Sequence, residues 1–436
     1  MANGGGTFLT YNKVIPGAYI NFVSAARATL DIADRGYAAI PVELDWGVEN
    51  EIFKVENRDF QTNTLKLFGY DITDEKMKNL RDLFSKAKTV YMYRLNGGGT
   101  KASNAYATAK YSGTRGNEIT IKVQTNIDES GKKDVITIFG TKKVDIQTVT
   151  AASELVDNDY VTFNKSGDLS ETAGAKLTNG ANLSSVTGAE HQKFLDLIES
   201  YTFNVIGCPS KEETIKKLYV QWTKRMRDEI GVKLQCVVHN LAADYEGVIN
   251  VKNKVKDSGA PEYALVYWLT GAEAACPVNA TLTNHKYDGD YTIDTKFTQS
   301  ELAEGIKKGQ LLFHNNSGEP YVLTDINSLT TITVEKNDDF QSNQVIRILD
   351  QIGNDIARLF NKKHLGHTRN NEAGREALWR DIVAHHQELE RIQALENFDP
   401  KQLKVEKGPT KKSVIVNDPV IPVACMEILY MTVVVA

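Results

Sequence analysis

The sequence predicts a multidomain protein of mixed α+β and α/β class, with a central mixed sheet flanked by helices, an inserted mostly-β domain, and extended strand arms at both ends. Three observations lead to this fold class. The chain has 436 residues, 41% hydrophobic and 25% charged, so it can form several compact units with their own cores. After residue 188, helix-type and strand-type patterns alternate, which is typical of a sheet covered by helices. Between residues 96 and 187, short β-type runs alternate with polar turns.

These patterns divide the chain into five segments, with a flexible glycine run at residues 96–100 as the clearest boundary. The predicted segments are an N-terminal extended arm (1–25), a small α/β domain (26–95), an inserted β-rich outer domain (96–187), an α/β core domain (188–335), and a C-terminal domain with two long helices and a terminal strand (336–436).

The α/β region is read from strands and helix starts. Residues 204–208, 234–238 and 247–251 are apolar runs of the buried-strand type. Ser210 and Glu213 have the spacing of a capping box, which predicts a helix from there to about residue 230.

The last part of the chain carries the strongest helical signals. Thr298 and Glu301 mark a short helix start, and a hairpin is expected around residues 317–320. Apolar residues at helical spacing predict long helices over 343–360 and 372–395. Strands are expected near Val405, at 414–416, and from 426 to 435.

Charge and hydropathy exclude several partners. The formal net charge is −5, so the chain repels nucleic acid on average. The most apolar stretch, residues 423–436, is too short to span a bilayer and contains Glu427. The N-terminus has no basic start followed by an apolar run. We therefore expect neither nucleic-acid binding nor membrane insertion, and a chain that stays in the cytoplasm until it meets a partner.

The motifs of catalysis and cofactor binding are missing, so we predict no catalytic residue, cofactor or metal. No GxSxG elbow occurs, and the glycine run at 96–100 lacks the Walker pattern. His364 and His367 have HxxH spacing in a context unsuited to a metal. His385 and His386 are neighbours on a helix, so we expect one to pack and the other to be solvated.

The C-terminus carries the most informative pattern. Met426, Ile428, Tyr430 and Val434 lie on one face of a predicted strand, and the opposite face is also apolar. A strand of this kind is an aggregation hazard if it stays uncovered. It must pair either with its own domain or with a neighbouring copy.

The N-terminus suggests the same behaviour. Tyr19, Ile20 and Phe22 belong to an apolar strand-like run that follows Pro16-Gly17. We expect hinges at Pro16 and Gly17, and, ahead of the C-terminal strand, at Pro419 and Pro422.

Four stretches, in order along the chain, resemble the tail sheath proteins of contractile phages and phage-tail-like bacteriocins (tailocins), especially those of Gram-positive prophages. They are residues 15–22, 109–117, 177–180, and the run from 397 to 431. The third stretch departs from the family pattern, which more usually has two glycines where this chain has Asn179-Gly180.

The resemblance implies a structural protein. Such subunits form a helical homopolymer around an inner tail tube, terminal arms link neighbours by strand exchange, and contraction drives the tube through a cell envelope. The implied partners are the inner tail tube protein and the baseplate and tail terminator proteins. The implied core domain is partly subtilisin-like without catalytic residues. The implied location is a virion or tailocin tail, assembled in the bacterial host cytoplasm.

The tube contact is expected at the basic residues Lys362, Lys363, Arg369 and Arg375, which suit an acidic tube surface. The alternative for Lys362 and Lys363 is a solvated helix end. Two rival functions stay open: an α/β hydrolase-like enzyme with an accessory β domain, and another surface or secretion-apparatus lattice protein.

Overall fold

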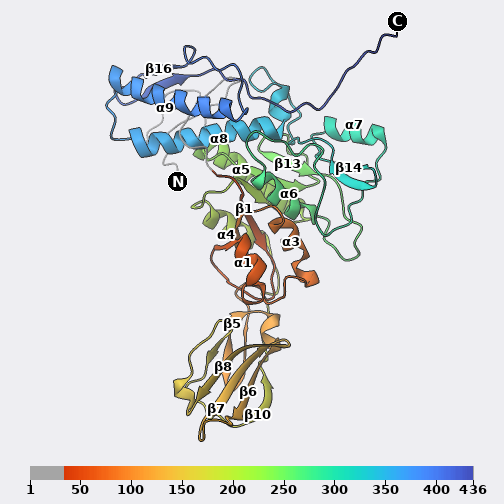
Figure 1. Ribbon diagram of the computed structural model, residues 1–436, viewed down its shortest axis with the longest axis vertical. Helices are drawn as coiled ribbons and strands as arrows, with labels where there is room; N and C mark the ends of the chain where they lie inside the picture. The colour runs from red at the N-terminus through yellow and green to blue at the C-terminus, as the bar shows by residue number, and fades with distance from the viewer. Residues whose placement is uncertain (1–33, 436) are drawn as a thin grey trace. The chain divides into compact units, whose positions relative to one another are not determined.

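The computed structural model describes residues 34–435, which form two compact units (Figure 1). Within these residues, the first unit contains 34–39, 79–88 and 200–435, and the second contains 40–78 and 89–199. The fold is mixed α+β with several sheets, as predicted. The five-segment division stays a prediction. The predicted N-terminal arm and hinge, with Pro16, Gly17, Tyr19, Ile20 and Phe22, lie outside the described residues.

The core of the first unit is a parallel sheet. Its strands, in spatial order, are β13 (Val248–Val251), β12 (Gln235–His239), β11 (Val205–Gly207) and the first half of β1 (Tyr37–Val42). Every residue of β11, β12 and β13 is buried. This agrees with the apolar runs predicted as buried strands, since a parallel sheet is covered on both faces.

Helices α5 (Glu213–Lys224) and α6 (Leu265–Ala275) pack on this sheet. Helix α5 continues through a π-helical turn to Ile230, so its predicted end is confirmed. Its predicted capping box is wrong. The N-cap residue is Glu212, and the Ser210 hydroxyl accepts a hydrogen bond from the Glu212 N–H (3.1 Å) instead of capping the helix.

Two smaller predictions in the first unit are confirmed. Helix α7 (Gln299–Lys307) has a complete capping box, in which Thr298 N–H donates to the Glu301 carboxylate (2.7 Å) and Glu301 N–H donates to Thr298 Oγ1 (3.3 Å). The predicted hairpin is formed by β14 (Phe313–Asn316) and β15 (Glu319–Val322). The unit also contains α3 (Lys78–Phe84) and the 3-10 turn η5 (Asp338–Gln341).

The two predicted long helices are α8 (Asn343–Leu359) and α9 (Glu372–Arg391). They pack through a cluster that includes Ile348, Ile352 and Ile382, each at most 1% exposed. The π-helical turn η6 (Phe360–His364) follows α8. The antiparallel hairpin of β16 (Lys404–Lys407) and β17 (Val414–Asn417) adds to the same cluster, and Figure 1 shows β16 beside α9.

The second unit contains a β-sandwich. One sheet has the order β10-β6-β7-β8 and the other has the order β4-β5-β9. Side chains of both sheets share one core, which also contains Trp46. The strands are β4 (Lys101–Ser103), β5 (Ala107–Ser112), β6 (Ile119–Thr125), β7 (Lys133–Phe139), β8 (Lys142–Val149), β9 (Val161–Phe163) and β10 (Thr172–Lys176).

Arg94 braces the base of this sandwich. Its guanidinium, 1% exposed, donates to the carbonyls of Leu44 (2.9 Å) and Ser112 (2.8 Å) and to Asn182 Oδ1 (3.1 Å). The entry and exit of the inserted domain are therefore tied to one buried cation, which needs these acceptors to offset its desolvation.

The remaining elements of the second unit include the antiparallel strands β2 and β3. They are β2 (Phe53–Glu56), α1 (Asn57–Thr62), α2 (Thr64–Phe68), η1 (Glu75–Met77), β3 (Thr89–Arg94), η2 (Thr114–Glu118), η3 (Ala152–Glu154) and α4 (Gly188–Ile198).

The buried His239, at the end of β12, predicts a loss of stability in acid. Burial lowers the pKa of His239 to about 4, and the neighbouring Lys216 also lowers it, while Asn253 O faces His239 Nε2 at 3.2 Å. As the pH falls from about 6.5 to 4, the unfolded chain takes up a proton that the folded chain does not. The free energy of unfolding should therefore decrease by up to about 3 kcal/mol over this window through His239 alone.

Urea unfolding at pH 7.0, 5.5 and 4.5 measures this effect. His239→Gln keeps an N–H donor for Asn253 but does not titrate, so the variant should lose less stability between pH 7.0 and 4.5 than the parent. Equal acid sensitivity in the two chains would contradict the assignment.

Candidate inter-subunit interface

The C-terminal segment is anchored to the first unit before it extends away. Residues 421–423 run beside residues 394–396 through two backbone hydrogen bonds, of 2.9 and 3.1 Å, and one bridge. Next, the Cys425 N–H donates to Gln344 Oε1 of α8 (3.0 Å). The path of the chain is therefore fixed up to Cys425.

Glu427 makes the last side-chain anchor of this segment. Its two carboxylate oxygens accept hydrogen bonds from the hydroxyls of Thr283 (2.6 Å) and Thr324 (2.7 Å). The Thr283 hydroxyl also accepts from the Asp325 N–H (2.8 Å), so it is held in place from the other side. We call this arrangement, formed by Glu427, Thr283 and Thr324, the Glu427 clamp.

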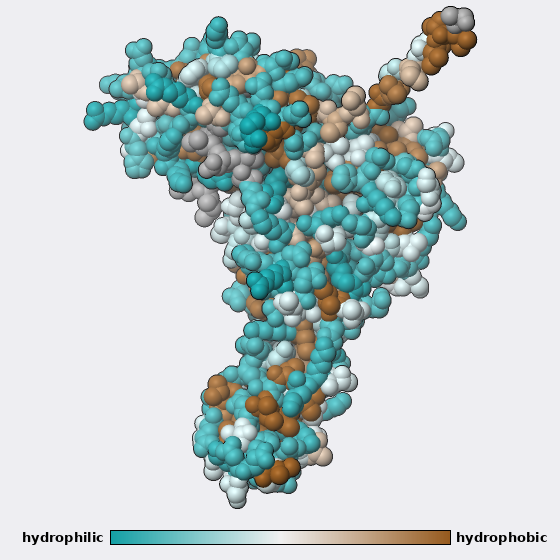
Figure 2. All heavy atoms as spheres, in the orientation of Figure 1, coloured by the Kyte–Doolittle hydropathy of each residue, from teal (hydrophilic) through white to brown (hydrophobic). Residues whose placement is uncertain are grey.

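Residues 428–435, which we call the C-terminal arm, lie beyond the clamp. Figure 1 shows them leaving the unit as an extended chain, and Figure 2 shows their apolar side chains uncovered. The large apolar side chains of the arm are 70–91% exposed, and Met426, just before the clamp, is fully exposed. Ile428, Tyr430 and Val434, predicted as contacts, belong to this set.

The arm pairs with no strand in residues 34–435. Among the described residues no backbone group pairs with the arm, and all but one of its side chains are large, apolar and exposed to water, which is an unfavourable state for a strand of this composition. The sequence left two possible partners for this strand, its own domain or a neighbouring copy. The arm does not pair with the described part of its own domain.

The two predicted C-terminal hinge residues lie upstream of the clamp. Pro419 is exposed, whereas Pro422 is half-buried and bridges to Leu395. Pro422 is therefore held in this structure, and the hinge role of both prolines stays a prediction.

A buried charge cluster lies behind the clamp. Arg347 Nη2 binds Glu273 Oε2 (2.6 Å) and Asp325 Oδ2 (3.1 Å), and Asn343 donates to Asp325 Oδ1 (2.8 Å). Burial, reinforced by the Asp325 charge, raises the pKa of Glu273 to about 8. Burial therefore favours the protonated form of Glu273, which reduces the number of charges that this buried cluster has to pair.

The predicted tube-contact residues do not behave alike. Lys362 and Arg369 are exposed. Lys363 forms an ion pair with Asp381 of α9 (2.5 Å), and Arg375 is half-buried with Nη1 on Asn370 Oδ1 (3.2 Å). Lys362 and Arg369 are therefore available to contact another protein, whereas Lys363 and Arg375 bind side chains of their own unit.

The structure brings two further cations to this group. Asn370 Nδ2 donates to the carbonyls of Ser413 (2.8 Å) and Lys411 (3.2 Å), which attaches the β16–β17 turn to the start of α9. Lys411 and Lys412, both exposed, therefore lie near Arg369. The Thr410-Lys411-Lys412 run was visible in the sequence, but nothing local indicated its place beside α9.

The expectation that one of His385 and His386 is solvated is wrong. Both are fully buried, because α9 lies between α8 and the segment that follows β17. Their Nδ1 atoms are 3.4 Å apart. His385 Nε2 faces Asp355 and His386 Nε2 faces Asp418, each at 3.2 Å. The pair joins three segments of the first unit.

In the HxxH motif, the His364 side chain contacts two polar side chains of its own unit. His364 Nε2 lies 2.9 Å from Asp381 Oδ2, and its Nδ1 lies 3.0 Å from Thr368 Oγ1. Across residues 34–435, no cluster of histidine, cysteine and carboxylate side chains has the arrangement of a metal site.

In the same range, no helix combines the length and the apolar character needed to cross a membrane.

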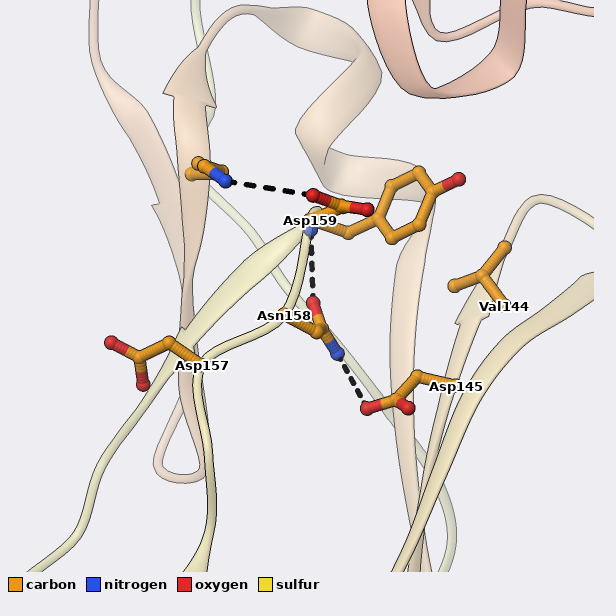
Figure 3. A pocket seen from close by; sticks show the side chains of 7 residues that line it. Val144, Asp145, Asp157, Asn158 and Asp159 are labelled. Carbon is orange, nitrogen blue, oxygen red and sulfur yellow. Dashed lines mark hydrogen bonds and ion pairs between the residues drawn. The ribbon is translucent and has the colours of Figure 1, made fainter. Parts of the chain in front are cut away.

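A surface pocket of the second unit bears on the enzyme alternative (Figure 3). It measures about 340 Å³ and is lined by Lys110, Val144, Asp145, Asp157, Asn158, Asp159 and Tyr160. Asp145 accepts from Asn158 (2.9 Å), which itself accepts from the Tyr160 N–H (2.9 Å), and Asp159 lies near Lys110 (3.9 Å). These polar side chains hold a turn together, and the lining contains no serine, threonine, cysteine or histidine of the kind that a hydrolase triad uses.

Family models match the chain in four consecutive regions. These are the "Tail sheath protein Gp18 domain III N-terminal region" (residues 35–95), the "Phage tail sheath protein beta-sandwich domain" (97–182), the "Phage tail sheath protein central domain" (184–328) and the "Phage tail sheath C-terminal domain" (335–436).

Relatives agree with these matches. The phage-like element PBSX protein XkdK of Bacillus subtilis is 34% identical over 383 residues, which are 81% of each chain. The helical sheath of the anti-feeding prophage in its contracted state has a TM-score of 0.55 at 13% identity and covers 97% of this chain and 99% of that one, a likeness of fold. The solved sheath tail protein of Desulfitobacterium hafniense is 35% identical with a TM-score of 0.81, and covers 93% of this chain and 96% of that one.

The homologues are structural tail sheath proteins rather than enzymes. With sheath-type matches along nearly its whole length, this chain belongs to the phage tail sheath protein family.

Proposed function

We propose that this protein is the repeating subunit of a contractile tail sheath, which polymerises helically around an inner tail tube and contracts to drive that tube through a cell envelope. The observation that carries the proposal is the C-terminal arm, an eight-residue strand-like segment with apolar side chains on both faces and no partner in the described part of its own chain. A second copy of the chain can supply the burial that the described residues do not, as the strand exchange of a helical homopolymer would.

Strand donation is an effective link between copies. Covering an isoleucine, leucine or methionine side chain contributes about 1.5–3 kcal/mol, and each main-chain hydrogen bond adds about 1 kcal/mol net. Ordering the arm opposes this by about 1–2 kcal/mol per residue. Several apolar residues in sequence are therefore needed, and the arm supplies seven large ones.

The β16–β17 hairpin is the acceptor that we propose. Both of its strands are edge strands, since the hairpin is a two-stranded sheet among the described residues. Val405 and Val414 already pack on the core that α8 and α9 share, so an added strand would extend a supported sheet. A bare two-stranded sheet is marginal in water, and a third strand stabilises it.

Contraction then requires no chemistry. We propose that subunits move as nearly rigid bodies while the donated strands stay paired, with bending at residues 417–422 once the anchors of residues 421–427 open and, by the resemblance, at Pro16 and Gly17. The contracted anti-feeding prophage sheath, which has the same fold, supports the idea that this fold takes part in such a state. Baseplate, tail terminator and inner tube proteins are the further partners, and the assembly is a virion or tailocin tail built in the host cytoplasm.

Deleting residues 428–436 should abolish polymerisation and leave the subunit folded. The large side chains of residues 428–435 are 70–91% exposed, so the melting temperature should stay within about 2 °C of the full chain. Negative-stain microscopy and sedimentation give the polymer, and calorimetry gives the melting temperature.

A matched pair of variants controls for exposed charge. Leu429→Asp with Val433→Asp places two charges on one face of the arm and should also prevent assembly. Ile127→Asp, at a side chain of the second unit that is 95% exposed, should assemble normally. Long sheaths from the truncated chain would refute strand donation.

The proposed acceptor can be tested in trans. A peptide of residues 424–436, carrying a solubilising lysine tag, should bind the truncated subunit and slow amide hydrogen exchange in residues 404–417. A peptide with aspartate at positions 429 and 433 is the control. Protection that appears elsewhere, with residues 404–417 unchanged, would reject the hairpin as acceptor.

The tube contact is proposed at the exposed cations around the start of α9. Reversing Lys362, Arg369, Lys411 and Lys412 to glutamate should weaken co-assembly with the tube protein and leave sheath formation without a tube intact. The measurement is co-sedimentation at low and at physiological salt, because exposed charge pairs are screened by salt.

The control for this charge reversal carries the same change of net charge elsewhere. Lys101, Lys143, Lys176 and Lys307 are also exposed, and their reversal should leave tube binding unchanged. Equal binding by both quadruple variants would remove the α9 surface from the proposal.

A further inference from the structure

We propose that Glu427 is a positioning residue, whose clamp by Thr283 and Thr324 sets the register of the donated strand. This inference rests on the proposed strand donation and goes beyond it, because it assigns the alignment of the strand to a polar contact within the donor subunit. The three side chains come from segments that are 144 and 103 residues apart in the sequence from Glu427.

The arm itself cannot fix its register. A strand with one apolar and one polar face has a defined register, since a shift by one residue would turn its apolar side chains toward water. In this arm, Ile428, Tyr430 and Val434 alternate with Leu429, Met431, Val433 and Val435, so a one-residue slip exchanges one apolar face for another. Such a slip moves the strand by about 3.3 Å and leaves the buried apolar area nearly the same.

A fixed point outside the arm removes this ambiguity. Glu427 immediately precedes the arm, and both of its carboxylate oxygens are bound. Thr283 is fixed by the Asp325 N–H, and Asp325 is held in turn by the buried Arg347. The starting point of the arm is therefore tied to the core of the subunit, so each arm residue reaches a set distance from the donor.

The anchors upstream of Glu427 fix the chain less tightly. Cys425 is held only through its backbone N–H, and the next contacts are the backbone hydrogen bonds of residues 421–423. Without the clamp, two or more additional residues join the arm, which gives it enough slack for a shift by one residue.

The native cysteines provide a local probe of the clamp. Cys425 is exposed, and Cys208, Cys236 and Cys276 are buried. A nitroxide reagent should therefore label Cys425 selectively, two residues from Glu427. In the full-length chain, kept below the concentration at which it polymerises, the label should have restricted motion.

Two clamp variants test the inference, Glu427→Met and Thr324→Val. Each removes hydrogen bonds and keeps similar side-chain volume. The Cys425 label should become mobile, and exchange of the Cys425 amide, which donates to Gln344 Oε1, should rise about tenfold. The variants should still polymerise, but cryo-electron microscopy should show sheaths with mixed register and weakened helical order. Thr324→Ser retains the hydroxyl and should restore both the restricted label and the ordered sheath.

The outcomes separate this inference from the proposed function. A label as restricted as in the parent chain, or variant sheaths as ordered as the parent sheath, would overturn the role of Glu427 while strand donation stands. Failure of the parent chain itself to polymerise would overturn strand donation, and the register role with it.

Discussion

The buried guanidinium of Arg347 organises the region from which the arm emerges. It binds Glu273 of α6, Asp325, and the Ala280 carbonyl (2.6 Å), so α6, the loop that follows it and the segment around Asp325 converge on α8. Burial favours the protonated form of Glu273, and removing either partner of the Arg347–Asp325 ion pair would leave a buried charge at a cost of several kcal/mol. The Asp325 N–H donates a hydrogen bond to the Thr283 hydroxyl, and Thr283 in turn binds Glu427. The position of an exposed, apolar segment thus depends on a fully buried polar network.

The arm has to satisfy two opposing requirements. An apolar strand binds a neighbour well, but the same composition promotes aggregation before assembly. Placing a carboxylate at the base of the arm meets both requirements. The charge of Glu427 interrupts the apolar run at the point where the chain leaves the body, and its hydrogen bonds limit how far the arm can search for incorrect partners. A charge within the arm would lower the affinity for the acceptor, whereas a charge at its base does not need to be desolvated there.

Much of the fold was predictable because local patterns agree with the tertiary structure. Ile348 and Ile352 recur at helical spacing on α8 and face the same core as Ile382 of α9, and the first six residues of β6 alternate between buried and half-buried. Two motifs with the same capping-box spacing can still form different structures. Thr298 and Glu301 form a capping box, but Ser210 and Glu213 do not, because Ser210 turns to the Glu212 N–H before the helix begins. His385 and His386 show the same limit, since both faces of α9 are covered by segments that a helical pattern alone does not reveal.

The candidate interface was predictable only in part, for a physical reason. The residue types of a segment show whether it needs to be buried, so the apolar arm was predictable from the sequence. The anchors depend on which residues the fold brings together. Thr283 and Thr324 are ordinary threonines in loops, and no sequence spacing relates them to Glu427. In the sequence Glu427 looks like an interruption that weakens a strand. In the structure the same carboxylate has two hydroxyl partners, and it marks the boundary between the part of the chain that belongs to the donor and the part offered to a neighbour. A single charge at the edge of an apolar run can therefore define where a donated strand begins.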